Sequence, residues 1–465
     1  MANSNYQPFP SFTRWQAIPV GGSWLEFLAI LNELKKTADD ATKDRALSYV
    51  LRSAALETGA LEGLYSTNRG VTRTVAIQAA QWEVELHELG TDVPGHFKAQ
   101  LAAFELIFDA ATSATPISEA WLRRVHETVC AAQSTYRVLT QLGWQDRALE
   151  RGVYKTEPNN VTLKDGSTHW YASPADVPGE MHRLMEEIRS EAFLAANPIL
   201  QASFAHYAFV AIHPFADGNG RLARVFASVF LYRAAGIPLV IFSDQQLQYW
   251  DALATADLGK NEPFVRFVEA RAVDTLMLVT ANLREAINPL DQQAALLHQT
   301  FRVPEGITEA EAQAIGRRIG ESIRDGLRQQ IQDLKLPPDV SFWIEEFPGH
   351  IDCTFWDRPY KSLGRGGMSK IHFDAQAPGV RVEMTPIVGR AVDPVNEYTY
   401  IVVDANRPNT APLLLRLMDM HPLATAAAES LIESWEKTAL SALLAELGGN
   451  VRASNEQRQL EERGW

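Results

Sequence analysis

The chain has 465 residues, of which 46% are hydrophobic and 22% are charged, a balance typical of soluble globular domains with sizeable cores. A chain of this length is expected to contain about two to four domains. Its formal net charge of −14 disfavours non-specific nucleic-acid binding, which depends on basic patches, and the sequence contains no run of Lys and Arg.

The cysteines and the apolar stretches of the sequence indicate the compartment in which the protein is expected. Cys130 and Cys353 lie far apart and make neither a disulfide framework nor a zinc site, so we expect a reducing, cytoplasmic compartment. The N-terminal residues contain no charged segment followed by an apolar core, so no secretory signal is expected. The longest apolar stretch, residues 225–242, is interrupted by Arg233, Gly236 and Pro238, so no membrane-spanning helix is expected either.

The first half of the chain is expected to be mainly helical. Residues 1–20 show no periodicity and are predicted to form an irregular arm. Apolar residues then recur at helical spacing in several segments, and Ser118 is a candidate N-cap for one of them. The predicted helices span residues 23–36, 46–65, 75–89, 94–111, 116–132, 177–191, 198–212, 225–235 and 262–283.

One segment within this helical region has a different character. Val153–Lys155 and His169–Tyr171 are short β-prone runs on either side of Asp165-Gly166, a dipeptide typical of hairpin turns. The sequence therefore predicts a β-hairpin within residues 151–174.

The pattern changes again beyond about residue 290, where helical and strand-like segments are mixed. A helix is predicted over residues 308–334, and the polar tail after Gly448 is predicted to fray. Strands are predicted at 341–345, 351–355, 369–373, 380–384 and 398–403, and further helices at 413–419 and 423–447. This order indicates an α+β domain.

The most informative stretch runs from His213 to Arg224 and lies between two apolar helical runs. Its sequence, His-Pro-Phe-Ala-Asp-Gly-Asn-Gly-Arg-Leu-Ala-Arg, places two glycines at the start of the second helix. There the first backbone N–H groups have no intrahelical partner, and glycine lets an anion approach the backbone closely. We therefore predict an anion nest for phosphate groups at Gly218 and Gly220.

Side chains in the same stretch supply the other parts of phosphate chemistry. Asp217 offers a hard oxygen ligand for the Mg²⁺ that would accompany phosphates. Arg221 and Arg224 lie three residues apart and can face the same anion. His213 is the only side chain of the stretch that titrates near neutral pH, so it is the natural general base.

The stretch closely resembles the Fic motif, H-x-F-x-[DE]-G-N-G-R-x-x-R, because it matches every specified position. The matching residues are His213, Phe215, Asp217, Gly218, Asn219, Gly220, Arg221 and Arg224. The resemblance implies a mainly α fold, in which a Fic-like helical core carries a β-hairpin flap that docks the target's extended chain. The expected organisation is an N-terminal helical region with an inhibitory helix (residues 1–100), the Fic-like core (101–285) and a C-terminal α+β domain of unknown role (286–465).

The resemblance also implies a reaction, the transfer of AMP from ATP to a Ser, Thr or Tyr hydroxyl of a target protein. ATP and Mg²⁺ are the implied cofactors, and the chain itself could serve as a target. In this scheme His213 accepts the hydroxyl proton, Asp217 holds Mg²⁺ and Phe215 anchors the loop. The nucleotide-binding residues are Gly218, Asn219, Gly220, Arg221 for the β-phosphate and Arg224 for the γ-phosphate. No nucleic acid or membrane partner is expected, and the oligomeric state is left open.

A second motif lies at the end of a predicted helix. Thr58–Gly63 resembles the inhibitory motif of Fic proteins, [ST]-x-x-x-E-[GN], and precedes the Fic motif as in the class with an N-terminal inhibitory helix. The resemblance implies that Glu62 forms a salt bridge with Arg224 and so occupies the arginine for the γ-phosphate. The neighbouring Ser53–Thr58 almost fits the same pattern but lacks the final Gly or Asn.

Three alternatives to forward AMP transfer remain. The same Glu serves in some Fic proteins to remove AMP from a modified target, which would make Glu62 catalytic. Other Fic relatives transfer UMP, phosphocholine or phosphate, but the phosphate-transferring ones replace the glycine at position 220 with Lys, so Gly220 favours nucleotidyl transfer. A non-catalytic nucleotide-binding module is the third alternative, and the presence of both His213 and Asp217 disfavours it.

Overall fold

The computed structural model describes residues 6–77, 82–112, 116–140, 143–162, 166–287, 309–346, 353–355, 358–363, 369–376, 379–391, 400–407, 410–420 and 425–462. The chain forms two compact units. The first comprises Met1–Val20 and Leu34–Ile287, and the second comprises Gly21–Glu33 and Asn288–Trp465. The domain limits expected near residues 100 and 285 stay a prediction. No helix in the described part of the chain combines the length and apolar content that crossing a membrane requires.

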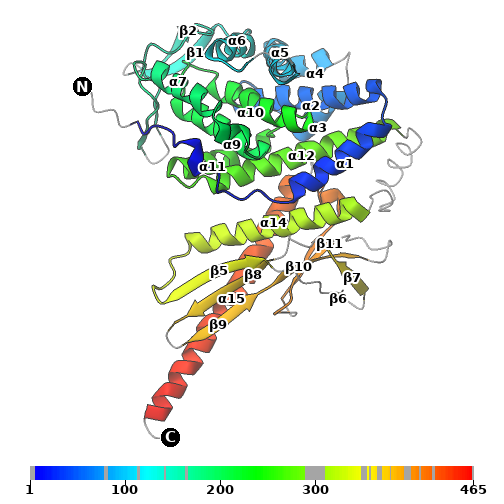
Figure 1. The fold of residues 1–465 in the computed structure, drawn as a ribbon, viewed down its shortest axis with the longest axis vertical. Helices are drawn as coiled ribbons and strands as arrows, with labels where there is room; N and C mark the ends of the chain where they lie inside the picture. The colour runs from blue at the N-terminus through cyan, green and yellow to red at the C-terminus, as the bar shows by residue number, and fades with distance from the viewer. Residues whose placement is uncertain are drawn as a thin grey trace. The chain divides into compact units, whose positions relative to one another are not determined.

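The first unit is built mainly from helices, which confirms the expected mainly α fold (Figure 1). Helix α1 (Ser23–Thr37) begins in the second unit and ends in the first. The remaining helices of the first unit are α2 (Asp40–Leu61), α3 (Arg69–Ile77), α4 (Trp82–Leu89), α5 (Val93–Thr112), α6 (Glu119–Val129), α7 (Val177–Glu187), α8 (Glu191–Leu194), α9 (Pro198–Ile212), α10 (Asn219–Ala235), α11 (Gln246–Asp257) and α12 (Glu262–Ile287), with short 3₁₀ turns at Phe12–Arg14 and Ser243–Gln245.

Helices α9 and α10 form the centre of this unit and lie side by side in Figure 1. Helix α9 is apolar on all sides, as expected for a helix buried in a core, and nearly all of its side chains are buried. It begins with Pro198 in the first turn, and the side chain of Asn197 accepts a hydrogen bond from the Ile199 N–H at 2.9 Å. The loop between the two helices carries the Fic-like motif, so the motif is attached to the most buried part of the unit.

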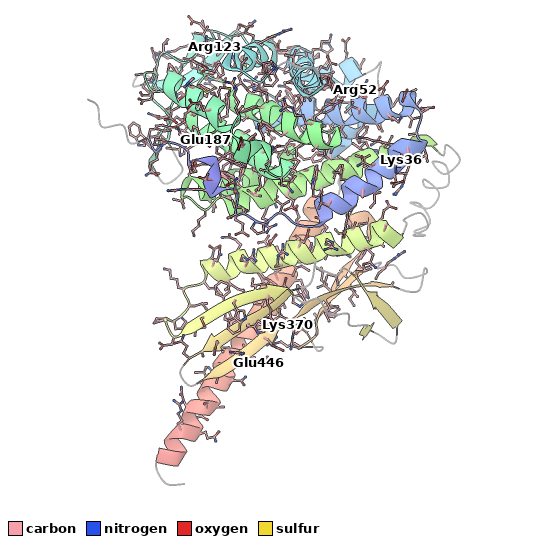
Figure 2. The ribbon with its side chains drawn as sticks, viewed as in Figure 1. Lys36, Arg52, Arg123, Glu187, Lys370 and Glu446 are labelled. Atoms are coloured by element: carbon pink, nitrogen blue, oxygen red, sulfur yellow. The ribbon has the colours of Figure 1, made fainter. Side chains whose placement is uncertain are left out.

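The N-terminal arm is anchored by aromatic side chains although its backbone is mostly irregular. Phe12 and Trp15 are fully buried and pack edge-on against Phe204 of α9. Glu187 of α7, labelled in Figure 2, accepts a hydrogen bond from the Phe12 backbone N–H at 3.1 Å. The arm is therefore a part of the core that periodicity could not reveal.

Several predictions for the first unit need correction. The helix predicted over residues 75–89 is divided between α3 and α4, and residues 78–81 lie outside the described part. The hairpin pairs β3 (Val161–Thr162) with β4 (Thr168–His169), so the predicted first arm at residues 153–155 is wrong. That segment lies instead along the motif loop, where the Lys155 N–H donates to the Pro214 carbonyl at 2.8 Å. Asp165 of the predicted turn lies outside the described residues.

Four elements of the first unit were not predicted. Strands β1 (Thr135–Thr140) and β2 (Gly143–Ala148) form an antiparallel hairpin directly after α6, α8 follows α7, and α11 follows α10. By contrast, α6 begins as predicted, because the Ser118 hydroxyl accepts a hydrogen bond from the Trp121 N–H at 3.2 Å.

The second unit has the predicted α+β character. One antiparallel sheet has the strand order β5-β8-β9, and another has the order β12-β11-β10-β7-β6. Helix α15 packs against β8 and β9, and α14 packs against α15 and β10 (Figure 1). The elements are α14 (Glu309–Asp333), β5 (Val340–Glu346), β6 (Cys353–Phe355), β7 (Arg358–Ser362), β8 (Ser369–Ala375), β9 (Val380–Met384), β10 (Pro386–Ala391), β11 (Tyr400–Asp404), β12 (Leu413–Leu415), a 3₁₀ helix (Leu417–Met420) and α15 (Thr425–Glu462).

The predictions were wrong at two places in this unit. Residues 413–419 do not form a helix, because Leu413–Leu415 pair with β11 and only a 3₁₀ turn follows. The chain also does not fray after Gly448, since α15 continues through that glycine to Glu462. Strands β7 and β10 were not predicted.

Candidate active site

The motif loop begins at a strained position. Helix α9 ends at Ile212 and is capped by His213, whose backbone has φ 52° and ψ 59° and whose N–H donates to the Phe209 carbonyl at 3.0 Å. His213 is the only non-glycine residue with positive φ among the described residues. This left-handed conformation costs a residue with a side chain about 1–2 kcal/mol, so the fold accepts strain to place an imidazole here.

Three neighbouring side chains fix the His213 ring. The amide Nδ2 of Asn159 lies 2.7 Å from His213 Nδ1, and the amide Nδ2 of Asn219 lies 3.2 Å from the same atom. Tyr171 stacks on the ring, with a centroid distance of 4.0 Å and an interplanar angle of 12°. Burial, followed by the charges of Lys155 and His169, lowers the pKa of His213 well below its usual value. The imidazole is therefore neutral at pH 7, the charge state that a general base needs.

The loop itself is held by the side chain of Asn219. Its Oδ1 accepts from the Phe215 N–H at 2.9 Å, and its Nδ2 donates to the Phe215 carbonyl at 2.8 Å. Phe215 is fully buried and stacks on the buried His126 at 3.9 Å, as the prediction of an anchoring role requires. The role predicted for Asn219 in nucleotide binding stays a prediction.

His126, to which sequence reasoning gave no function, also supports the loop. Its Nδ1 accepts a hydrogen bond from the Gly152 N–H at 2.8 Å, so its Nε2 carries a proton and donates to the Asp217 carbonyl at 2.9 Å. Burial lowers the pKa of His126 to about 4. His126 is therefore a neutral, packed histidine that fixes the backbone of the motif.

The predicted anion nest lies at the start of α10. Gly218 is the N-cap with φ 78°, a conformation that favours glycine, and α10 begins at Asn219. A Cβ on Gly218 would meet the buried Cys130 sulfur at 2.5 Å, and a Cβ on Gly220 would overlap Oε1 of Glu62. Gly218 is therefore required by its backbone conformation and by Cys130, whereas a side chain at position 220 would displace the Glu62 carboxylate.

Arg221 provides two unused donors beside this nest. Its side chain is 1% exposed, and its NH2 group donates to Oε1 of Gln133 at 2.6 Å. Its Nε and NH1 atoms are buried and have no hydrogen-bond partner among the described residues. Unsatisfied buried guanidinium groups are costly, so this arrangement suits a bound anion that accepts both hydrogen bonds.

Gln133 joins the arginine to the predicted metal ligand, and sequence reasoning missed it. Its Nε2 donates to Oδ2 of Asp217 at 2.6 Å, while Oδ1 of Asp217 accepts from the Gly218 N–H at 2.6 Å. Gln133 follows α6 in a turn that no motif singles out. Only the folded chain brings its amide between Asp217 and Arg221.

Asp217 is the single residue of the site that was predicted to bind a metal ion. No group of three or more metal-ligating side chains occurs in the described part of the chain. The Asp217 side chain is 38% exposed. One accessible carboxylate fits Mg²⁺, which commonly binds through one or two carboxylates together with substrate phosphates and water.

The second motif arginine is occupied by the end of α2. Arg224 NH2 forms a salt bridge with Oε1 of Glu62 at 2.7 Å. Thr58 accepts two further hydrogen bonds from Arg224, at 2.7 Å through its hydroxyl and at 3.0 Å through its carbonyl. Arg224 NH1 lies 3.5 Å from the hydroxyl of Tyr249. The structure therefore places Glu62 on Arg224, the contact that the resemblance implied, and adds Thr58, for which no such contact was predicted.

The near match at residues 53–58 has a different environment. Glu57 is buried and accepts hydrogen bonds from the Thr72 hydroxyl and from the Ser243 N–H, the latter at 2.7 Å. Burial raises the pKa of Glu57. Glu57 is thus held away from Arg224, and Glu62 is the carboxylate at the site.

Known proteins resemble the part of the chain that carries this site. Residues 116–231 match the family model described as Fic/DOC family. The chain contains a Fic domain. It is 34% identical over 162 residues to Protein adenylyltransferase Fic of Aedes aegypti, an alignment that covers 32% of this chain and 31% of that protein. It is 37% identical over 132 residues to Protein adenylyltransferase Fic of Drosophila mojavensis, covering 28% and 26%. The chain thus spans about a third or less of each of these relatives.

Among solved structures, a Fic domain containing signaling protein from Bacteroides thetaiotaomicron VPI-5482 is 23% identical, with a TM-score of 0.47, and the alignment covers 57% of this chain and 99% of that one. Within the Fic domain, the β3–β4 hairpin lies in the chain just before the helices that carry the motif. Tyr171, which follows this hairpin, stacks on His213. The assignment of the β3–β4 hairpin as the flap stays a prediction.

Proposed function

We propose that the protein transfers AMP from ATP to a Ser, Thr or Tyr hydroxyl of a target protein and releases pyrophosphate. The observation that carries the proposal is the pair of buried, unpartnered Arg221 donors beside the glycine nest, within the same loop as the neutral His213. The names of the relatives, Protein adenylyltransferase Fic, support the same activity.

Each residue of the loop has a part in this reaction. His213 accepts the proton of the target hydroxyl as its oxygen attacks the α-phosphorus, and the bond to pyrophosphate breaks. The N–H groups at Gly218–Gly220 and the guanidinium of Arg221 bind the α- and β-phosphate oxygens. Asp217 would hold Mg²⁺, which supplies charge neutralisation on the phosphates when bound.

We further propose that Glu62 inhibits this reaction. A guanidinium pairs with either a carboxylate or a phosphate at a given edge, so the Glu62–Arg224 salt bridge excludes the γ-phosphate from Arg224. ATP then binds weakly or in an unproductive position. The wild-type chain should therefore modify itself or a target at a low rate.

Removal of AMP from a modified target is the second candidate. The Glu62 carboxylate lies against Gly220, within the nest, and its side chain is 29% exposed. A carboxylate in that position can orient a water molecule toward a phosphorus bound in the nest. A side chain at position 220 would displace the Glu62 carboxylate from this position.

The test is transfer of label from ATP labelled at the α-phosphate. Glu62→Gly frees Arg224, so AMP incorporation should rise well above that of the wild type, and adding Arg224→Ala should remove most of the gain. Adding His213→Ala should lower turnover by about two to four orders of magnitude with little change in ATP affinity. Glu57→Gln is the matched control, since Glu57 does not touch Arg224, and it should label like the wild type.

Several outcomes would contradict the proposal. Equal labelling by wild type and Glu62→Gly would show that Glu62 does not inhibit. Full turnover by His213→Ala in the Glu62→Gly background, or in excess chelator, would contradict the base or the Mg²⁺ assignment. If Glu62→Gly instead loses the ability to strip AMP from a pre-modified target, the second candidate function is favoured. The target's identity, a cytoplasmic location and the oligomeric state stay predictions or open questions.

A further inference from the structure

The side-chain amide of Asn159 has an orientation that its neighbours determine. Its Oδ1 accepts a hydrogen bond from Lys155 Nζ at 2.6 Å, and its Nδ2 donates to the Phe215 carbonyl at 2.8 Å. Burial lowers the pKa of Lys155 to about 7, and a neutral amine can also accept a hydrogen bond, but the Phe215 carbonyl only accepts and so fixes the NH₂ end of Asn159 in both charge states of Lys155. The NH₂ end of Asn159 therefore faces Nδ1 of His213, at 2.7 Å.

The other amide near the same nitrogen is fixed in the same sense. Asn219 accepts from the Phe215 N–H through Oδ1 and donates to the Phe215 carbonyl through Nδ2, and this Nδ2 lies 3.2 Å from His213 Nδ1. Both polar groups that approach Nδ1 are therefore donors. A neutral imidazole has one donor and one acceptor nitrogen, so Nδ1 must be the acceptor and Nε2 must carry the proton.

This tautomer has a consequence for catalysis. Nε2 of His213 has no hydrogen-bond partner among the described residues, so it is the nitrogen left for an incoming hydroxyl. With a proton already on Nε2, the ring can donate to that hydroxyl but cannot accept its proton there. The mechanism proposed above needs the opposite tautomer, with the proton on Nδ1 and a lone pair on Nε2.

We infer that Asn159 and Lys155 are positioning residues that decide which nitrogen of His213 carries the proton, and that they hold the imidazole in the non-accepting tautomer in this state. Rotation of the Asn159 amide by half a turn would present Oδ1 to Nδ1–H and leave Nε2 able to accept. The Phe215 carbonyl opposes that rotation, and so does Lys155 in its charged form. The side chain of Lys155 is 5% exposed, and Oδ1 of Asn159 is its only hydrogen-bond partner in the described part of the chain. The link to catalysis rests on the proposed function, but the tautomer assignment does not.

The direct test is NMR of the full chain labelled with ¹⁵N in histidine, using long-range ¹H–¹⁵N correlation, which distinguishes protonated from unprotonated ring nitrogens. His213→Ala identifies the His213 signals by their loss. At pH 7.5 the wild type should show an unprotonated Nδ1 and a protonated Nε2. Asn159→Asp should reverse this pattern, because a carboxylate only accepts hydrogen bonds. Lys155→Met should shift the pattern less than Asn159→Asp does, because the Phe215 carbonyl still holds the NH₂ end of Asn159.

The matched control is Asn160→Asp. Asn160 neighbours Asn159 but accepts from the Tyr171 N–H at 3.0 Å through its Oδ1, which an aspartate retains, so the His213 tautomer should not change. A protonated Nδ1 in the wild type would overturn the inference. So would an Asn159→Asp spectrum with the wild-type pattern.

A second measurement connects the tautomer to turnover. In the Glu62→Gly background, adding Asn159→Asp should raise AMP incorporation severalfold, because more of His213 then accepts at Nε2, and Lys155→Met should raise it by less. A reversed tautomer without any gain in rate would overturn the positioning role. If no variant transfers label while the NMR pattern holds, the proposed function fails and the tautomer assignment stands.

Discussion

His213 has a backbone conformation that glycine adopts more readily than any residue with a side chain. Its φ of 52° places it in the left-handed region at the end of α9, where glycine is the commonest residue. We expect His213→Gly to be more stable than His213→Ala by about 1 kcal/mol, because only glycine adopts this conformation without steric cost. Both variants should be inactive.

Chemical denaturation of the two variants measures this difference, and their shared loss of the imidazole makes each a control for the other. An alanine variant as stable as the glycine variant would show that position 213 is not strained. A confirmed difference would mean that the fold gives up stability for the placement of the catalytic group.

For individual residues, the sequence predicts the chemistry of those that are contiguous in the motif. It does not predict the residues from distant segments that contact the motif. The residues His213 to Arg224 carry their own geometry, since a helix end, a loop and a helix start follow one another in the chain. Gln133, Asn159 and Tyr171 reach the same place through tertiary folding, and each belongs to a segment whose local pattern is ordinary. Their types, an amide or an aromatic ring, have no fixed spacing from the motif.

At the scale of elements, the end of α2 depends on a close approach at Gly59. A Cβ on this residue would overlap the hydroxyl of Tyr65 and the amide of Gln100, which meet each other at 3.0 Å in the core. Glycine to alanine within a helix ordinarily stabilises by about 1 kcal/mol. Here we expect Gly59→Ala to destabilise by about 1–3 kcal/mol, because overpacking outweighs helix propensity.

Gly179 in α7 is the matched control, because a Cβ there would meet no atom within 4 Å, so Gly179→Ala should leave stability unchanged or raise it. Thermal unfolding of both variants gives the comparison. Since Gly59 lies in the last turn before Glu62, the displaced helix end should also weaken the Glu62–Arg224 pair and raise AMP incorporation. A stabilising Gly59→Ala would contradict the close packing.

Elements with strong periodicity could be predicted, and those that depend on partners could not. Helices α1, α5, α9 and α12 bury continuous apolar faces, and their limits fall close to the predicted ones. The segment at 153–155 has strand propensity, but the motif loop takes its backbone hydrogen bonds. Leu413–Leu415 is a strand only because Tyr400–Val402 offers an edge to pair with. Gly448 and Gly449 do not end α15, since each glycine weakens a long helix by only about 1 kcal/mol.

At the scale of the whole molecule, buried neutral histidines should make the fold sensitive to acid. His126 and His206 are fully buried, and burial lowers their pKa values to about 4 and about 3. In the unfolded chain a histidine titrates near pH 6.5. Between pH 6.5 and these lower values the unfolded state binds more protons than the native state, so stability falls as the pH falls.

The size of the effect follows from the same pKa differences. At pH 5 each histidine should cost about 2 kcal/mol of stability relative to pH 7.5, a large fraction of the 5–15 kcal/mol typical of a folded domain. His206→Gln removes one of the two titrating groups. Its amide oxygen can still accept from Tyr249, whose hydroxyl lies 3.0 Å from His206 Nε2. The loss between pH 7.5 and pH 5, measured by urea denaturation, should therefore be smaller by about 2 kcal/mol in this variant than in the wild type.

His182 provides the control, because its side chain is 71% exposed and lies 3.5 Å from Glu186 at the surface. His182→Gln should show the same pH dependence as the wild type. If His206→Gln loses as much stability as the wild type on going to pH 5, His206 is already protonated in the native state. The hydrogen bond from the Tyr249 hydroxyl to Nε2 would then be wrong, because a protonated imidazole has no acceptor. Since Tyr249 also contacts Arg224, that result would revise the surroundings of the γ-phosphate arginine as well.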